Sequence, residues 1–310
     1  MNILSMQDRR LREVERFCPN CWINLTDPED DEIRLVSQQF DIEEDMLRAA
    51  LDEEESAHVD VEDNNLLVIV DIPIVQPDAH ETFFYSTIPL GIIICPDAFI
   101  TVCTRETTLI EDFLEGRVKQ FTPAKKTRFL LQILYRNATK FLQYLKQIDK
   151  ASSVVESELQ RSMRNRELLQ MMRLEKSLVY FSTSLTGNEV ILEKLLKSPS
   201  LVRYPDDEEL LEDVIIENKQ AIEMCTIYRD ILSGTMDAYA SVISNNLNIV
   251  MKFLASFTIV LTIPQLVFGL FGINTGVPWE SSMVGFWVVL GIGVVTSIIS
   301  VAILWHKKMF

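Results

Sequence analysis

Two long uncharged apolar runs lie near the C-terminal end of the chain. The first covers residues 253–273 and the second covers residues 283–305. An α-helix rises about 1.5 Å per residue, so each run can cross a hydrocarbon core of about 30 Å. The pattern predicts two transmembrane helices, an outer loop at residues 274–282 and a short basic tail at residues 306–310.

Charges beside these runs predict the orientation of the spans. Lys252 precedes the first run, His306 and Lys307 follow the second, and the loop carries Glu280 as its one charged residue. Positive charge is enriched on the cytoplasmic side of membrane spans. We therefore expect a multi-pass protein of the cytoplasmic (inner) membrane, with both termini in the cytoplasm.

Short apolar runs rich in β-branched and aromatic residues fill the region between residues 21 and 104. They are CWINLT, AHVDVE, LLVIVDIPIV, TFFYSTIPLGIIIC and AFITVCT. Asp, Asn, Pro and Gly bound these runs, as is typical of strands, and residues 28–55 favour short acidic helices. The pattern predicts a cytoplasmic domain of α+β or α/β class over residues 1–108.

Amphipathic patterns of helical period begin at about residue 109. They predict one helix from residue 123 to about 150, a second from 152 to about 182, and a shorter one at 186–197. Together they make a helical part of the cytoplasmic region at residues 109–205.

Proline spacing predicts one very long helix after this region. Pro205 is followed by no other proline before Pro264. A helix that begins near Asp206 can therefore continue through a stalk at residues 206–252 and into the first span. Such a helix, extended to residue 272, would be roughly 100 Å long.

One face of this predicted helix carries small and polar residues in alternating steps of four and three. The members of this polar stripe are Asp237, Ser241, Ser244, Asn248, Met251, Ala255, Thr258, Thr262, Gln265 and Gly269. A period of 3.5 residues is typical of a helix-bundle seam. Polar groups that faced lipid would lack partners, so we expect the stripe to face protein or a water-filled cavity.

The polar stripe has two interpretations. Two spans cannot enclose a pore, so a pore would require several copies of the chain, each contributing this face. A packing seam between membrane helices uses the same small and polar residues. Asp237, which precedes the membrane, favours the pore, because a ring of carboxylates there would attract cations.

Composition excludes several classes of function. The 310 residues include 29 Lys and Arg against 45 Asp and Glu, which gives a formal net charge of −16. Such a chain would repel nucleic acid.

The acids of residues 27–63 form either a solvated surface or a cation-attracting face. The sequence contains no GxxxxGK[ST] phosphate-binding motif and no hydrolase or kinase motif, so an enzyme is not predicted.

Five scattered cysteines favour reduced thiols in a cytoplasmic compartment. Cys18 and Cys21 form a CxxC motif, which occurs in redox pairs and in half zinc sites. No second CxxC is present, so a four-thiolate site would need Cys95, Cys103 or Cys225 to converge on it. The sequence favours two ordinary thiols before a strand.

The loop after the first span contains a candidate outer mouth. Gly272 and Gly276 let the chain leave the helix, and Pro278 prevents its return. Asn274 would then cap the narrow end of a ring of copies. Its amide oxygen is a hard, uncharged ligand that suits hydrated Mg²⁺, an ion that sheds its water reluctantly.

The tripeptide Gly272-Ile273-Asn274 resembles the Gly-Met-Asn signature of the CorA-type divalent-cation transporters. Its position at the end of the first of two C-terminal spans is similar to that of the family. The segments SNNLNIVMK (244–252) and YRDILSGTMDAY (228–239) also resemble that family, as do YFSTSLTGNEVILEKL, CWINLTDPEDDEI and the basic C-terminal end. The resemblance implies a cytoplasmic α/β funnel, a stalk helix, and a homopentameric pore that the first span forms in the lipid bilayer.

The resemblance also assigns roles to individual residues. It implies that Asn274 receives the hydrated ion and that Asn248 forms a polar ring near the inner end of the pore. Met251 and Leu254 would form a hydrophobic constriction. Asp237 would form an inner acidic ring, and Asp213 would help to bind a regulatory Mg²⁺. The remaining candidates are the pore-lining Ala255, Thr258, Thr262, Gln265 and Gly269, and Glu280 in the outer loop.

Two departures from the family pattern concern the choice of ion. Ile273 replaces the methionine of the signature, and Thr262 stands where the family implies a bulky apolar gate residue. The family carries Mg²⁺, Co²⁺ or Ni²⁺, and one branch carries Zn²⁺ and also departs at the central signature residue. The predicted function is Mg²⁺ influx driven by the membrane potential and inhibited by internal Mg²⁺, with no organic cofactor. The alternatives are a Zn²⁺ transporter of the same family and a membrane-tethered oligomeric sensor or scaffold.

Overall fold

The computed structural model describes residues 1–7, 10–62, 64–77, 83–118, 121–162, 165–197, 204–272 and 283–307. The chain divides into two compact units, Met1–Gly234 and Thr235–Phe310. The long helix α6 (Pro205–Phe271) contributes residues to both units, and each unit is described by itself.

A mixed sheet forms the centre of the first unit. Its strands, within the described residues, lie in the order β2-β1-β3-β7-β6-β5-β4. Their bounds are β1 (Asn2–Gln7), β2 (Arg10–Glu13), β3 (Cys21–Thr26), β4 (His58–Glu62), β5 (Asn65–Pro77), β6 (Phe83–Ile94) and β7 (Ala98–Cys103). Neighbouring strands are antiparallel except β3 and β7, which pair in parallel with Cys21 opposite Ala98.

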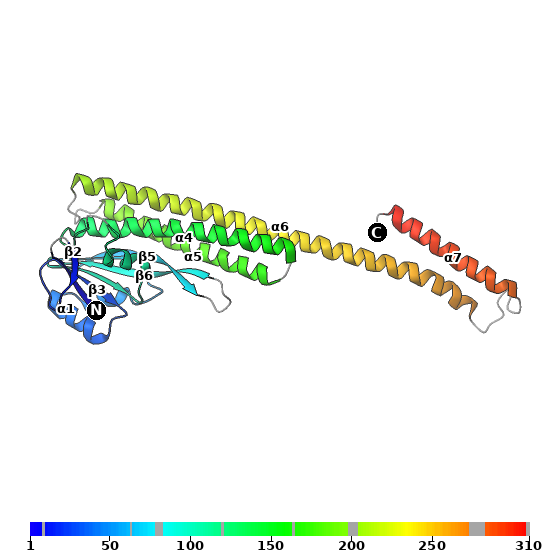
Figure 1. Ribbon diagram of the computed structural model, residues 1–310, viewed down its shortest axis with the longest axis horizontal. Helices are drawn as coiled ribbons and strands as arrows, with labels where there is room; N and C mark the ends of the chain where they lie inside the picture. The colour runs from blue at the N-terminus through cyan, green and yellow to red at the C-terminus, as the bar shows by residue number, and fades with distance from the viewer. Residues whose placement is uncertain are drawn as a thin grey trace. The chain divides into compact units, whose positions relative to one another are not determined.

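Helices cover both faces of this sheet, as Figure 1 shows for α1 on one side and α4 and α5 on the other. One layer contains α1 (Asp30–Phe40) and α2 (Glu44–Ala49), and the other contains α3 (Thr108–Leu114), α4 (Lys126–Ser162), α5 (Asn165–Lys197) and the first part of α6. Alternate residues of β5 enter the two cores: Leu67 and Ile69 face α1 and α2, whereas Val68 and Val70 face the long helices. Burial on both faces explains why this strand reads as a continuous apolar run.

An aromatic cluster joins the sheet to the long helices. The Trp22 ring on β3 lies 5.1 Å from Phe129, 5.9 Å from Phe121 and 6.4 Å from Phe113, in edge-to-face geometry. Its indole N–H donates to the hydroxyl of Thr101 at 2.9 Å, so the polar group of a fully buried side chain has a partner.

The structure confirms the five predicted strands between residues 21 and 104 and the two acidic helices among residues 28–55. It also contains β1 and β2, which the sequence pattern did not predict. The segment that forms β2 is highly charged, and its strand conformation depends on pairing with β1, which in turn pairs with β3.

The predicted boundaries within the helical region were wrong. The expected break near residues 150–152 lies inside α4, and the expected boundary near residues 182–186 lies inside α5. At both places the helix continues, and the hydroxyl groups there donate to carbonyl oxygens of their own helix. Ser152 and Ser153 donate to the Asp149 carbonyl at 2.8 and 3.1 Å. Thr186 donates to the Ser182 carbonyl at 2.8 Å.

The long helix α6 confirms the predicted start near residue 206 and the predicted continuation into the first span. Pro205 occupies its first turn, where a missing N–H costs little. Within the first unit, α6 buries one line of residues, among them Leu211, Val214, Ala221 and Cys225. The Asn218 amide on the same side donates to the Leu185 carbonyl of α5 at 3.1 Å and fixes the register of the two helices.

A buried carboxylate gathers three cationic side chains beneath α3. Asp112 is fully buried, and its oxygens lie 2.9 Å from Arg117, 2.7 Å from Arg136 and 2.9 Å from Lys140. Burial opposes its ionisation, but the hydrogen bonds from Lys140, Arg136 and Arg117 prevail and lower the pKa of Asp112. The ion cluster therefore ties α3 to α4.

We predict that Asp112→Asn destabilises the first unit by about 3–5 kcal/mol, because the cations around it lose their buried counter-charge. The measurement is chemical unfolding of the full-length protein in detergent, followed by the fluorescence of Trp22 after the other three tryptophans are replaced by phenylalanine. The pKa of Asp112 is lower in the folded protein than in the unfolded chain. The stabilisation from Asp112 is therefore fully present at pH values above its pKa in the unfolded chain. It is lost as the pH falls through its pKa in the folded protein.

Asp31→Asn is the matched control for this prediction. Its carboxylate is 92% exposed and pairs with Arg34 at 3.6 Å on the surface, so removal should change stability by less than about 1 kcal/mol. Equal losses in the two variants would contradict a structural role for the buried cluster.

Candidate ion pathway

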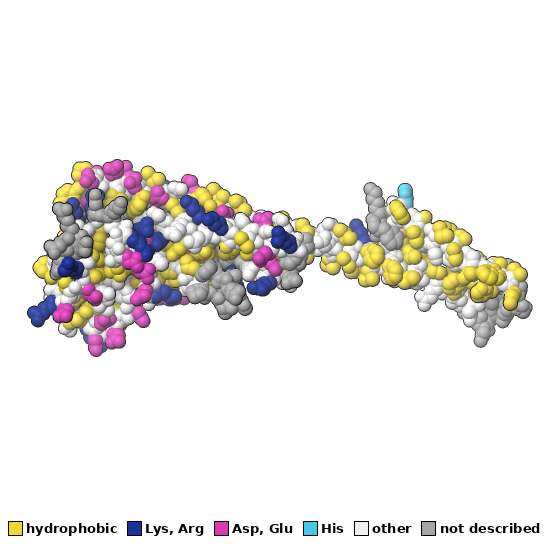
Figure 2. Space-filling model, in the orientation of Figure 1, with side chains coloured by type: hydrophobic (Ala, Val, Ile, Leu, Met, Phe, Trp, Pro, Cys, Tyr) yellow, Lys and Arg dark blue, Asp and Glu magenta, His cyan; other side chains and the backbone are white. Residues whose placement is uncertain are grey.

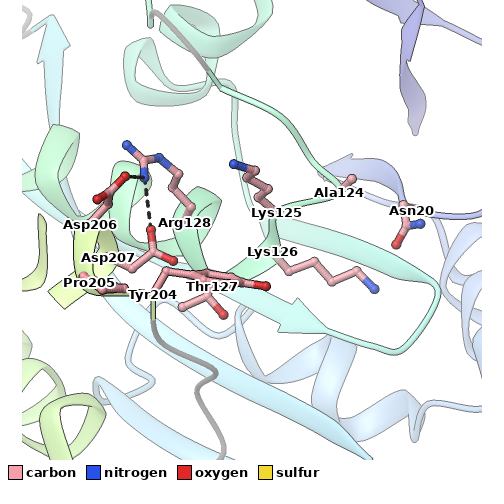
Figure 3. A pocket seen from close by; sticks show the side chains of 10 residues that line it. All are labelled: Asn20, Ala124, Lys125, Lys126, Thr127, Arg128, Tyr204, Pro205, Asp206 and Asp207. Carbon is pink, nitrogen blue, oxygen red and sulfur yellow. Dashed lines mark hydrogen bonds and ion pairs between the residues drawn. The ribbon is translucent and has the colours of Figure 1, made fainter.

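The second unit consists of two apolar helices, the last part of α6 and α7 (Met283–His306). Only 6% of the most apolar window of α6 and 17% of that of α7 is buried. In Figure 2, hydrophobic side chains cover most of the visible face of this unit. An apolar helix in the core of a soluble protein would be buried instead, so these two helices are membrane spans.

A line of small residues packs α7 against α6. The buried residues of α7 are Gly285, Gly293, Ser300 and Leu304. A Cβ atom on Gly293 would lie 2.6 Å from the ring of Phe268, so any other residue there would require this ring to move. On α6, Ser256 is buried, and Val260, Ile263, Pro264, Val267 and Phe271 are half-buried. These residues identify the side of α6 that faces α7.

The polar stripe lies on the other side of α6. At about 100° per residue, the members from Met251 to Gly269 centre roughly opposite the α7-facing side. All ten members, from Asp237 to Gly269, are exposed in the structure. The helix α7 therefore leaves this face open, and any cover for it comes from outside the described chain.

The polar groups of the stripe differ in how well their own helix satisfies them. The hydroxyl of Thr258 donates to the Leu254 carbonyl at 2.8 Å, and that of Thr262 donates to the Thr258 carbonyl at 2.7 Å. Their protons are thus satisfied, and oxygen lone pairs remain free to accept. For the amides of Asn248 and Gln265, no hydrogen bond is found within the described residues. Asn248 precedes the span, whereas Gln265 lies inside it, so the Gln265 amide carries the strongest demand for an outside partner.

The other candidate residues lie along α6 as follows. Met251 and Leu254 are 56% and 55% exposed, one helical turn apart at the start of the span. Gly272 directly follows the last residue of α6, and its N–H donates to the Phe268 carbonyl at 3.0 Å. Ile273, Asn274 and Glu280 lie outside the described residues.

A second exposed line lies on α6 within the first unit. It follows the same steps of three and four and consists of Asp213, Ile216, Gln220, Glu223, Ile227, Asp230 and Gly234. The sequence analysis identified only Asp213 of these residues. Extending the alternation toward the N-terminus would have found Glu223 and Asp230, two further acids on an uncovered helix face.

Metal-ligating side chains do not cluster in the described part of the chain. No group of three or more His, Cys, Asp or Glu residues there could hold a metal ion. In the second unit, the hydroxyl and amide oxygens of the polar stripe form a row along one face of α6. These oxygens are neutral and could accept hydrogen bonds from a hydrated ion.

Two candidate membrane spans and a polar face opposite their contact are the features of this unit that bear on the class of the protein. Residues 19–308 match the CorA-like Mg²⁺ transporter protein family, and the chain belongs to that family. It is therefore a divalent-cation transporter of the CorA class.

Individual relatives agree with this assignment. The cobalt/magnesium transport protein CorA of Methanocaldococcus jannaschii is 28% identical over 314 residues, covering 97% of this chain and 92% of the relative. The complete structure of the CorA magnesium transporter from the same organism superposes with a TM-score of 0.85 at 24% identity, over 97% of this chain and 96% of the other. The cytoplasmic domain of ZntB from Vibrio parahaemolyticus superposes with a TM-score of 0.60 at 14% identity. The match covers 79% of this chain and 97% of the other, and it shows a shared fold.

We predict that Gly293→Val destabilises the α6–α7 pair by about 1–3 kcal/mol, because the new side chain overlaps the Phe268 ring. The measurement is the midpoint of thermal unfolding in detergent micelles. Gly291→Val is the matched control, since a Cβ there meets nothing within 4 Å. Equal shifts in the two variants would show that the Phe268 contact does not hold the hairpin together.

Proposed function

We propose that this chain assembles into a homopentamer in the cytoplasmic membrane and conducts Mg²⁺ inward, with both termini in the cytoplasm. The observation that carries the proposal is the exposed polar stripe on the side of α6 opposite α7. Five copies around an axis would bring the stripes together and give the amides of Asn248 and Gln265 water and ions as partners. The pentamer itself rests on the family resemblance.

The membrane potential supplies the driving force in this proposal. Moving two positive charges through 100 mV, negative inside, releases about 4.6 kcal/mol. An ion that keeps most of its hydration shell needs hydrogen-bond acceptors rather than a tight cage, and Mg²⁺ is such an ion. The hydroxyl and amide oxygens of the stripe match that requirement, with Co²⁺ and Ni²⁺ as further candidate cargoes.

Specific residues would act at the two mouths of the pathway. In the proposal, Asn274 with Gly272 and Ile273 receives the hydrated ion outside, near Glu280. Met251 and Leu254 form the hydrophobic constriction, because both are exposed on adjacent turns at the start of the span.

Asp237 would contribute a ring of five carboxylates below the constriction and raise the local cation concentration. The pore between these rings would be lined by Asn248, Ala255, Thr258, Thr262, Gln265 and Gly269.

The first test is Mg²⁺ uptake into dye-loaded proteoliposomes under an inside-negative potential. Wild-type protein should admit Mg²⁺, and Asn274→Ala should reduce the rate at least about tenfold, since it removes a hydrogen-bond partner of a charged species. Asn245→Ala makes the same change at an exposed position outside the polar stripe and should retain the wild-type rate.

A parallel arm with Zn²⁺ under a proton gradient separates the alternatives. The replacement of methionine by Ile273 is the observation that favours zinc. Proton-dependent Zn²⁺ movement without Mg²⁺ entry would replace the proposal with a zinc transporter. No flux in either arm from folded protein would favour a tethered sensor or scaffold.

Regulation by internal Mg²⁺ forms the second part of the proposal. Asp213 is exposed on α6 and would bind Mg²⁺ against a neighbouring protomer, so that falling internal Mg²⁺ leaves the acids to repel and opens the pore. Asp213→Asn should raise the internal Mg²⁺ concentration that halves uptake by about fivefold, which corresponds to about 1 kcal/mol.

Glu212→Gln is the control, because Glu212 is also exposed on α6 but lies outside the line that contains Asp213. The measurement is uptake into proteoliposomes loaded with graded Mg²⁺. Unchanged inhibition in Asp213→Asn would remove this residue from the sensor and leave the transport proposal intact.

A further inference from the structure

The CxxC motif, which the transport function does not use, forms a tight turn before β3. The N–H of Cys21 donates to the carbonyl of Cys18 at 3.2 Å, and Asn20 has a φ of 58°. Proline at the second position and a positive φ at the third are the features of a type II β-turn. Such a turn holds its end residues within about 7 Å, and a disulfide requires a Cα separation of about 4.4–6.8 Å.

The surroundings hold this turn in its present form. The N–H of Asn20 donates to the carbonyl of Asp97 at 2.7 Å, which ties the turn to the connection between β6 and β7. Cys21 is the first residue of β3 and pairs with Ala98 of β7. The C-terminal half of the motif is therefore fixed by backbone contacts, and the turn bond from Cys21 to Cys18 keeps the two cysteines close together.

The two thiols have different environments. Cys18 is half-buried and reachable from solvent, whereas Cys21 is completely buried. Burial is the main reason that the pKa of Cys21 is raised, and the neighbouring Cys18 adds to the effect. This arrangement gives an outer sulfur that can meet a reactant and an inner thiol behind it that can complete an exchange.

A cavity of about 450 Å³ opens beside the outer sulfur. It is lined by Phe17, Cys18, Pro19, Gln39, Phe40, Asp41, Cys95, Pro96 and Asp97. The rings of Phe17 and Phe40 meet edge to face at 5.4 Å and form one wall. Two acids, Asp41 and Asp97, line the cavity, and one cation lies beside it: the ammonium of Lys126 donates to the carbonyl oxygens of Cys95, at 2.7 Å, and Pro96. The two carboxylates outweigh this single ammonium, so the cavity favours a neutral or cationic small molecule over an anionic one.

A third thiol, Cys95, lines the same cavity, and it raises the question of a metal site. Within the described residues, no group of three or more His, Cys, Asp or Glu side chains could hold a metal ion. Burial raises the pKa of Cys95 to about 12, so this thiol is a poor nucleophile toward a disulfide. Cys18 and Cys21, which share one turn, are therefore the pair placed for thiol exchange.

We propose that Cys18 and Cys21 form a reversible dithiol–disulfide site that reacts with low-molecular-weight disulfides of neutral or cationic type. The Cys18 thiolate attacks one sulfur of the small disulfide, forms a mixed disulfide and releases one small thiolate. The Cys21 thiolate then attacks the Cys18 sulfur, closes the Cys18–Cys21 bond and releases the second small thiolate. The protein loses two electrons and two protons, and the small disulfide becomes two thiols.

The test uses the full-length protein in detergent with cystamine as the oxidant. Cleavage after Arg16 and Arg34 yields one peptide that contains both cysteines of the motif and no other. Its mass should fall by two hydrogens after treatment and return after reduction with dithiothreitol. A peptide that remains a dithiol in folded protein, but is oxidised in denaturant, would overturn the proposal.

Single variants distinguish the two sulfur atoms. Cys21→Ser should retain one half of cystamine on Cys18, and Cys18→Ser should leave Cys21 unmodified. Cys225→Ser is the control and should oxidise like the wild type, since the Cys225 thiol is buried and donates to the Leu178 carbonyl at 3.2 Å. Modification of Cys21 in Cys18→Ser, or a bond to Cys95, would contradict the assigned order.

Charge preference tests the role of the cavity. At low ionic strength, cystamine should oxidise the motif several times faster than oxidised glutathione, which is anionic, and added salt should reduce the difference. Equal rates at low salt would overturn the part of the proposal that assigns the small disulfide to this cavity.

Discussion

Polar groups inside a hydrocarbon layer need partners, and the span of α6 depends on that constraint. The chain can satisfy its own backbone by forming a helix, and it satisfies Thr258 and Thr262 by bonds to carbonyls one turn earlier. It has no comparable solution for the amide of Gln265, because glutamine offers two donors and an acceptor. The other span does not help, since α7 packs on the opposite side of α6. In the proposed pore, assembly of several copies would give this amide water and ions to bind.

The contact between the two spans decides which face remains available. Gly293 brings α7 close to α6 through the Phe268 ring, and Ser256 is buried on the α7-facing side. Small residues permit this approach in lipid, where helices associate by close packing. The same contact that holds the hairpin together thus directs the polar stripe away from it. In the first unit, α6 likewise buries one line of residues and leaves its acids exposed.

The sequence predicted the features that depend on local signals. Hydropathy identified both apolar helices, and the absence of proline between Pro205 and Pro264 identified most of α6, which continues past Pro264 to Phe271. Boundaries that depend on side-chain hydrogen bonds were missed: Ser152, Ser153 and Thr186 resemble helix breakers in sequence but bond back to their own helices. The strands β1 and β2 were missed because their conformation comes from pairing with a neighbour.

The same distinction applies to the candidate site. The 3.5-residue period identified the polar stripe, because helix periodicity is a property of the sequence itself. No local signal gives the face that α7 occupies, which depends on Gly293 meeting Phe268 across the hairpin. For the turn at Cys18 and Cys21, the spacing of the thiols is likewise a local property of the sequence. The cavity beside them comes from segments that are far apart in the chain.

The chemistry of the stripe bears on which ion the proposed pathway favours. Zinc is bound in proteins mainly by cysteine thiolates and histidine nitrogens, with short bonds and few waters. The stripe contains neither residue type, and its one sulfur is the thioether of Met251, which prefers soft ions. Replacing the signature methionine by Ile273 removes a second thioether without adding a nitrogen or thiolate ligand. Hydroxyl and amide oxygens instead accept hydrogen bonds from the water around Mg²⁺. In the proposed pathway, the departure at Ile273 would therefore change the size and polarisability of the outer mouth, while the oxygen atoms of the stripe would retain the character expected of a magnesium pathway.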